Sequence, residues 1–110
     1  MKDDRLYLVH VRECIAYILE FTAEGKDAFS ADRKTQDAVL RNLHTLSESI
    51  QRISEDLKLR YPAVRWREIA AFRNVIVHDY LGIDLDQIWD IIERDLPTLK
   101  IQVEAILEGV

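Results

Sequence analysis

Apolar residues recur three and four positions apart along most of the chain, a spacing that predicts amphipathic helices rather than strands. The first stripe predicts a helix over about residues 4–22, which the turn at Gly25 ends. A second helix is predicted over about residues 32–59, before Tyr61-Pro62, because the residue preceding a proline avoids the α region. Its apolar residues form a narrow seam that predicts packing along another helix: Val39, Leu43, Leu46, Ile50, Ile53 and Leu57.

The second half of the chain predicts three further helices joined by short connections. One runs over about residues 65–81 and closes on Gly82, a left-handed cap. The next begins at Asp84, which forms a capping-box pattern with Gln87. Pro97 opens the last helix, because its ring suits the first helical turn. Short connections imply antiparallel neighbours, so residues 1–110 are expected to form a single all-α domain, an antiparallel bundle of about five helices.

Composition and cysteine usage are typical of a globular cytoplasmic protein. Hydrophobic residues make up 48% of the chain and charged residues 32%. No apolar run approaches the roughly 20 residues that cross a bilayer, and the charged beginning of the chain is unlike a signal peptide. The single cysteine, Cys14, lies in an apolar stretch and is expected to be a packed thiol rather than a nucleophile or a metal ligand. We therefore expect a cytoplasmic location and no contact with membranes.

The net charge of −5 argues against a general nucleic-acid coat protein, because phosphate binding needs clustered cations. The charge is unevenly distributed, however. Residues 58–73 contain five cations and one carboxylate, a balance of +4 that leaves −9 for the rest of the chain. Arg65 and Arg67 in this strip are candidates for contacts with the phosphates of RNA, and a solvated helix face is the alternative interpretation.

The polar side of the third predicted helix groups residues suited to phosphodiester chemistry. On a helical wheel, Asn74 and His78 lie about 40° apart and opposite to the inward face, and Arg73 lies about 20° from Tyr80 on its flank. An exposed imidazole can accept and deliver a proton near neutral pH, and a guanidinium offers a fork of donors to phosphate oxygens. Asn74 adds an uncharged donor and acceptor beside His78. No carboxylate cluster accompanies them, so no metal is predicted, and ordinary surface residues are the alternative on spacing alone.

Other residues with reactive or aromatic side chains favour structural roles. His10 and Glu13 are too few for a zinc site and are expected to form a surface pair. His44 follows a seam residue and is expected to pack at the boundary of the core. Trp66 and Trp89 are expected to be packing anchors rather than platforms for base stacking.

The run Arg73-Asn74, three apolar residues, then His78-Asp79-Tyr80 matches the R-N-x-x-x-H-x-Y signature of HEPN domains. The chain more specifically resembles HepT, the toxin encoded beside an MNT nucleotidyltransferase antitoxin in prokaryotes. The resemblance covers roughly residues 32–107 and departs at Ser47-Glu48, where family members often have Gly-Glu. Outside the signature it rests on these segments: Tyr61-Pro62, Trp66-Arg67-Glu68-Ile69, Ile83-Asp84, Trp89 and Asp95-Leu96-Pro97.

The resemblance implies a helical bundle that forms a homodimer, with two signature helices facing each other across a shared cleft. It implies metal-independent endoribonuclease activity on RNA without a cofactor, with Arg73 and His78 as the matching catalytic residues and Asn74 in support. It also implies that Tyr80 accepts AMP from the partner nucleotidyltransferase, which silences the toxin. The alternative is a non-catalytic dimeric subunit that binds a nucleotidyltransferase or presents nucleotide to it.

Overall fold

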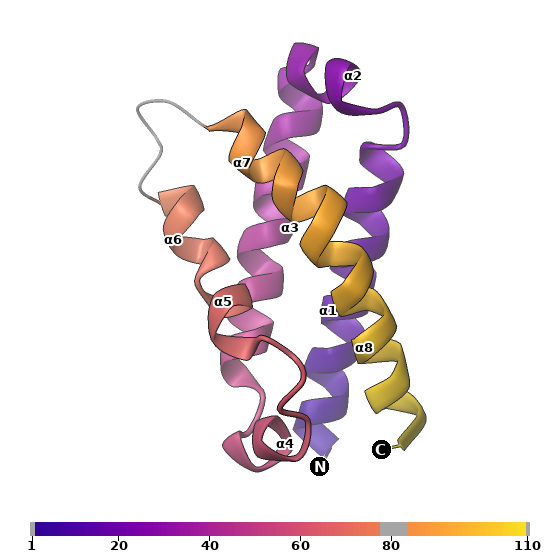
Figure 1. Cartoon of the computed structure of the whole chain (residues 1–110), viewed down its shortest axis with the longest axis vertical. Coiled ribbons are helices and arrows are strands. Elements are labelled where there is room, and N and C mark those ends of the chain that lie inside the picture. Colours follow the sequence, from indigo (N-terminus) through magenta and orange to yellow (C-terminus); the bar gives the residue numbers. More distant parts are fainter. Residues whose placement is uncertain (1, 78–83, 110) are drawn as a thin grey trace.

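Two long antiparallel helices, α1 (Lys2–Phe21) and α3 (Arg33–Arg52), are the longest elements of the bundle that the structure describes (Figure 1). The computed structural model describes the main chain of residues 2–77 and 84–109, and the side chains of residues 3–74 and 84–109. The described chain is helical with no strand, which confirms the all-α prediction. None of its helices is long and apolar enough to cross a membrane.

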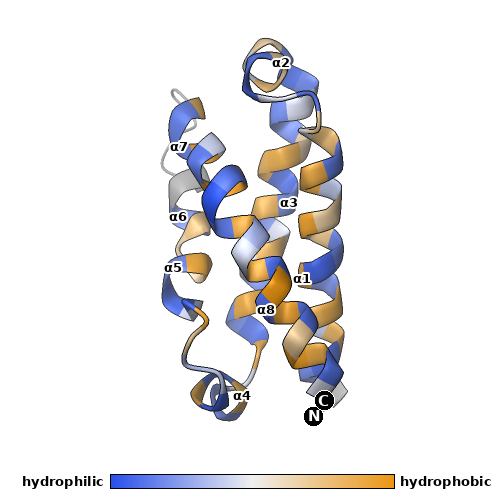
Figure 2. Ribbon diagram, turned by 45° about the vertical axis from the view of Figure 1, so that its right-hand side comes forward, coloured by the Kyte–Doolittle hydropathy of each residue, from blue (hydrophilic) through white to orange (hydrophobic). Residues whose placement is uncertain are grey.

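The predicted apolar stripes form the core between α1 and α3. Figure 2 shows apolar and polar positions interleaved along both helices, as in amphipathic helices that bury one face. The seam of the second predicted helix is fully buried, as expected, with exposed fractions between 0 and 3%. The matching residues of α1 are also completely inaccessible to solvent: Leu8, Val11, Ile15 and Ile18.

The turn after α1 depends on Gly25, whose φ of 98° lies in the left-handed region that glycine adopts without strain. A short helix, α2 (Lys26–Ala31), follows it where the sequence suggests only a connection. The side chain of Phe29 explains this helix, because its buried ring packs on Trp89 with centroids 5.5 Å apart. The next helix then begins as predicted, with Asp32 as its N-cap accepting a hydrogen bond from the Lys34 N–H.

The second predicted helix is not continuous, which corrects the expectation of one element over residues 32–59. It ends at Ile53, whose ψ of 140° is extended, and α4 (Glu55–Arg60) restarts after Ser54. Ser54 caps α4 by accepting from the Leu57 N–H at 3.2 Å. The buried carboxylate of Asp4 holds this break in place, since it accepts from the Ser54 N–H at 2.8 Å and from the Ser54 hydroxyl at 2.6 Å.

The third predicted helix is also divided, into α5 (Trp66–Ala70) and α6 (Phe72–Val77), with a turn at Ala71 between them. The Ala71 carbonyl accepts from the Asn74 N–H at 2.9 Å, so the chain continues in nearly the same direction. Both short helices pack against α3. The predicted end of this helix and its cap at Gly82 lie outside the described residues.

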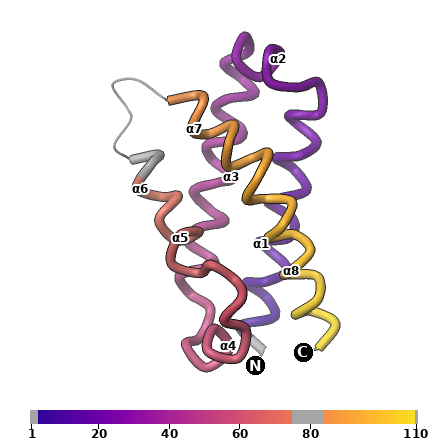
Figure 3. Tube along the Cα trace, viewed as in Figure 1, coloured from indigo at the N-terminus to yellow at the C-terminus, as the bar shows by residue number. Residues whose placement is uncertain are grey.

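The last two predicted helices form one uninterrupted rod, which Figure 3 traces from α7 (Leu85–Asp90) into α8 (Leu96–Gly109). Asp84 caps its start by accepting from the Gln87 N–H at 3.1 Å, as the capping pattern predicts. A widened π turn, η1 (Ile91–Asp95), joins the two helices, and the Leu96 N–H bonds the Ile91 carbonyl. Pro97 has no N–H and its ring crowds the preceding turn, so a widened turn accommodates it in place of the expected break.

Candidate functional site

The α5–α6 arm, residues 66–77, carries the described part of the HEPN-type signature. Arg73 and Asn74 are exposed, whereas Ile69 and Phe72 are buried against the bundle. For these residues the helical wheel therefore separates the polar and inward sides correctly, despite the turn at Ala71. His78 and Tyr80, the predicted acid–base residue and AMP acceptor, lie outside the described residues.

The cations of this arm and of its N-cap residue, Arg65, differ in whether their side chains have a partner. Arg67 and Arg73 are exposed, and within the described chain neither guanidinium group makes a hydrogen bond or an ion pair. Arg65 has its Nε 3.9 Å from Glu68 Oε2, a loose pair between two largely exposed side chains. Exposed pairs of this kind are worth about 0–1 kcal/mol, so Arg65 also remains able to exchange its partner for a phosphate.

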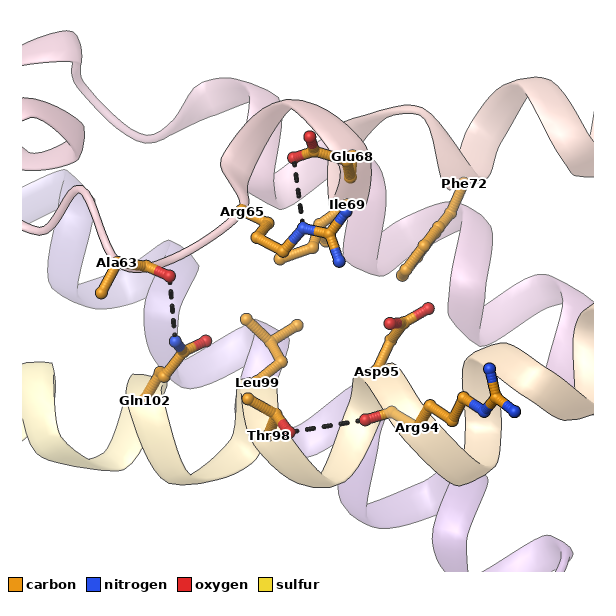
Figure 4. Close-up of a pocket in the computed structure, with 10 residues that line it drawn as sticks. All are labelled: Ala63, Arg65, Glu68, Ile69, Phe72, Arg94, Asp95, Thr98, Leu99 and Gln102. Atoms are coloured by element: carbon orange, nitrogen blue, oxygen red, sulfur yellow. Dashed lines mark hydrogen bonds and ion pairs between the residues drawn. The ribbon is translucent and has the colours of Figure 1, made fainter.

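A groove of about 340 Å³ separates the α5–α6 arm from the η1–α8 rod (Figure 4). Its floor is apolar and consists of the buried side chains of Ile69, Phe72 and Leu99. The following residues complete its lining: Ala63, Arg65, Glu68, Arg94, Asp95, Thr98 and Gln102. The groove reaches the residue directly before Arg73, so it borders the predicted site.

No pattern in the sequence indicates this groove. Arg94 and Asp95 are more than 20 residues from the signature arm's groove-lining positions, and neither belongs to a recognisable binding motif. The available signals were the charged run Glu93-Arg94-Asp95 after two isoleucines, and the Asp95-Leu96-Pro97 segment of the family resemblance. Neither signal reveals which surface Arg94 and Asp95 face.

A second polar cluster lies between α1 and α3 and corrects the surface-pair interpretation of His10 and Glu13. The His10 ring is half-buried, with Nδ1 2.6 Å from the Ser49 Oγ and Nε2 3.6 Å from the Cys14 Sγ. Glu13 is exposed and does not join these contacts. Cys14 Sγ also lies 3.5 Å from the hydroxyl of Thr45. This cluster links the two longest helices rather than opening a site.

The environment of Cys14 confirms that it is a packed thiol. Its exposed fraction is 3%, and burial raises the pKa of the thiol, although the hydrogen bond with Thr45 opposes that shift. A raised pKa keeps the sulfur protonated and poorly nucleophilic. Among the described residues no group of three or more histidine, cysteine or acidic side chains is placed to hold a metal ion.

Three other side chains occupy the structural positions expected for them. Trp66 and Trp89 are half-buried against the core, and the Trp66 indole donates to the Tyr61 carbonyl at 3.0 Å. His44 lies at the boundary of α3 and forms an ion pair with Glu48 when protonated. None of the three lines the groove beside the signature arm.

Comparison with known proteins gives the same family as the signature. The family model described as "Ribonuclease HepT-like" matches residues 11–106. A protein named probable ribonuclease HepT, from Thermococcus cleftensis, is 38% identical over 101 residues, which cover 91% of this chain and 92% of that protein. No solved structure matches the chain significantly.

Two relatives from Methanocaldococcus jannaschii also match along almost the whole chain. One, named a putative RNase, is 34% identical over 110 residues and is covered to 91%. The other is named a gamma-glutamylcyclotransferase and putative RNase; it is 32% identical over 108 residues, and this chain spans about half of it, 49%. With the family model covering most of its length and these relatives aligned throughout, this chain belongs to the HepT-like ribonuclease family.

Proposed function

We propose that this chain is the toxin of a HEPN/MNT toxin–antitoxin pair and cleaves RNA in the cytoplasm without a metal ion. The observation that carries the proposal is an intact signature, Arg73-Asn74 followed at the family spacing by His78, in a chain of the HepT-like ribonuclease family. The exposed side chains of Arg73 and Asn74 support it, because RNA and a second protomer can both reach that face.

The chemistry requires a homodimer, because in-line attack on phosphorus needs a base and an acid on opposite sides. His78 of one protomer removes the proton from the ribose 2′-hydroxyl, whose oxygen attacks the phosphorus. His78 of the second protomer protonates the 5′-oxygen as the bond from phosphorus to that oxygen breaks. Arg73 stabilises the negative charge that develops on the phosphoryl oxygens, and Asn74 supports the site as a neutral hydrogen-bonding group.

The products of this reaction provide its test. Purified protein incubated with short single-stranded RNA in EDTA is expected to leave 2′,3′-cyclic phosphate and 5′-hydroxyl ends. End-labelling and mass spectrometry distinguish these products from the 5′-phosphate ends of a metal-dependent nuclease. An RNA with a 2′-deoxy sugar at the cleaved position is the control and should stay intact. Cleavage that stops in EDTA, or that leaves 5′-phosphates, contradicts the mechanism.

Silencing by the antitoxin has a direct electrostatic explanation. An AMP group on Tyr80 adds bulk and negative charge, and the helical wheel of the sequence predicts that Tyr80 lies about 20° from Arg73. Its phosphate competes with RNA for the guanidinium and repels the RNA backbone. The MNT-type nucleotidyltransferase is the partner that would transfer AMP to the tyrosine hydroxyl and release pyrophosphate from ATP.

The variant Tyr80→Phe separates catalysis from silencing. It lacks the acceptor oxygen but keeps the ring, so RNA cleavage is expected to continue at about the wild-type rate while the nucleotidyltransferase and ATP no longer inhibit it. Radiolabelled AMP transfer and RNA cleavage are measured on the same samples, with wild-type protein as the control. If the variant is still labelled and silenced, another residue accepts the AMP.

A further inference from the structure

We propose that the groove between the α5–α6 arm and the η1–α8 rod holds the base of an unpaired nucleotide beside the phosphate at Arg73. In this proposal Asp95 selects bases that carry an amino group, and it thereby contributes to RNA specificity. The inference rests on the proposed nuclease activity and identifies the part of the RNA that the protein reads.

The size and floor of the groove suit a flat, partly apolar ligand. Its volume of about 340 Å³ lies at the lower end of the range of small-molecule sites, about 300–1,000 Å³. Ile69, Phe72 and Leu99 form the floor, and Figure 4 shows the Phe72 ring projecting toward the space between the arm and the rod. Unpaired bases in protein–RNA complexes pack on aromatic and apolar surfaces of this kind.

The charges around the groove favour a base over a phosphate. Arg65 and Arg94 are balanced by two carboxylates, Glu68 and Asp95, so the lining has no net positive charge. A phosphate inside would meet those carboxylates at close range. Arg67 and Arg73, whose guanidinium groups have no partner among the residues that the structure describes, do not line the groove. This arrangement places the RNA backbone along the outer cations and an uncharged base inside.

Asp95 is the polar group of the groove best placed to read a base. Its side chain is half-buried and points from the η1–α8 rod toward Phe72 (Figure 4). Within the described chain its carboxylate makes no hydrogen bond or ion pair. Two neighbouring polar groups already have partners: the Gln102 amide donates to the Ala63 carbonyl at 3.2 Å, and the Thr98 hydroxyl donates to the Arg94 carbonyl at 3.5 Å.

The chemistry of a carboxylate determines which bases it accepts. Asp95 can accept hydrogen bonds from the exocyclic amino groups of adenine, cytosine and guanine. Uracil has no amino group, and its one donor on the Watson–Crick edge, the N3–H, lies between two carbonyl oxygens that repel a carboxylate. Asp95 therefore discriminates against uracil at this position.

The groove is close enough to Arg73 to hold the base of a nucleotide whose phosphate contacts that residue. Phe72 and Arg73 are adjacent, with α-carbons about 3.8 Å apart, and one is buried toward the groove while the other is exposed. A nucleotide whose phosphate contacts Arg73 can thus turn its base over the Phe72 ring. The π turn that ends at Asp95 is a second local feature, since such turns occur frequently at functional sites.

The test compares four short single-stranded RNAs that differ only in the base next to the cleaved phosphate. Wild-type protein is expected to cleave the RNAs with an amino-bearing base about 5- to 150-fold faster than the uracil RNA. Asp95→Asn preserves the shape of the side chain but gives it an amide donor for uracil, so the ratio should fall toward one. Asp90→Asn is the matched control, because Asp90 is exposed at the end of α7, directly before η1, and does not line the groove.

Binding to RNAs with a 2′-deoxy sugar at the cleaved position is measured in parallel by fluorescence anisotropy. Base-dependent binding that Asp95→Asn abolishes, without any cleavage of the matching RNAs, supports the groove and refutes the nuclease. Two outcomes refute base recognition by the groove but not the nuclease activity. One is cleavage with the same base preference in wild type and Asp95→Asn, and the other is cleavage by the wild type with no base preference. A change in oligomeric state caused by Asp95→Asn, measured by light scattering, shows instead that the groove is a contact between protein chains and also overturns the proposal.

Discussion

Replacing His78 by alanine is expected to reduce the rate of RNA cleavage about 100- to 10,000-fold, the usual contribution of a general acid–base group. The effect should lie at the upper end, because the proposed dimer uses His78 twice, once as the base and once as the acid. Single-turnover cleavage of one RNA in EDTA measures the loss. Expression of the variant should also no longer arrest growth if the wild-type protein does.

His44→Ala is the matched control for this experiment. His44 is a half-exposed histidine on α3, where it pairs with Glu48, and it is not part of the signature. Its replacement should leave cleavage within about twofold of wild type, since it removes only a surface ion pair worth about 0–1 kcal/mol. Wild-type activity in the His78→Ala variant would refute the acid–base mechanism. If the wild-type protein also fails to cleave RNA, the non-catalytic, nucleotidyltransferase-binding subunit becomes the better explanation.

The largest effect on folding is expected from Leu43→Ala, which should lower the free energy of unfolding by about 2–5 kcal/mol. Leu43 is completely buried in the seam between α1 and α3, the most extensively packed pair of helices in the bundle. Removing three carbon atoms leaves a cavity that the two long helices cannot close without disturbing the neighbouring seam contacts. Urea denaturation followed by circular dichroism measures the change, at one fixed protein concentration so that self-association does not alter the comparison.

Leu59→Ala makes the same chemical change on the surface. Leu59 is 76% exposed on α4, so its replacement should change the free energy of unfolding by no more than about 0.5 kcal/mol. Comparing the two variants separates the effect of burial on the free energy of unfolding from the effect of replacing a leucine. Equal destabilisation by both would mean that the seam is not the core of the folded protein.

The periodic pattern of the sequence was sufficient to predict the helical class and most of the core. Seam residues from Val39 to Ile50 are buried because their spacing places them on one face of α3, which must be covered to remove it from water. Local chemistry predicted the cap at Asp84 and the turn at Gly25 in the same way. These features depend on residues only a few positions apart, so they can be read without knowing the tertiary structure.

The positions of Arg73 and Asn74 were also predictable, because the wheel depends only on neighbours within two helical turns. Their proposed roles came from the family signature rather than from geometry. The predicted face of His78 and the modification of Tyr80 stay predictions, since both residues lie outside the described chain.

The tertiary structure alone determined where the predicted long helices are interrupted and which surfaces the helices form together. The interruption at Ser54 depends on Asp4, 50 residues earlier, and the packing of Phe29 depends on Trp89, which lies far along the chain. The groove likewise forms only when Phe72 and Asp95 meet from two separate helical segments. The spacing of apolar residues indicates which side of a helix each residue lies on. The packing of the whole bundle determines which other helix covers that side.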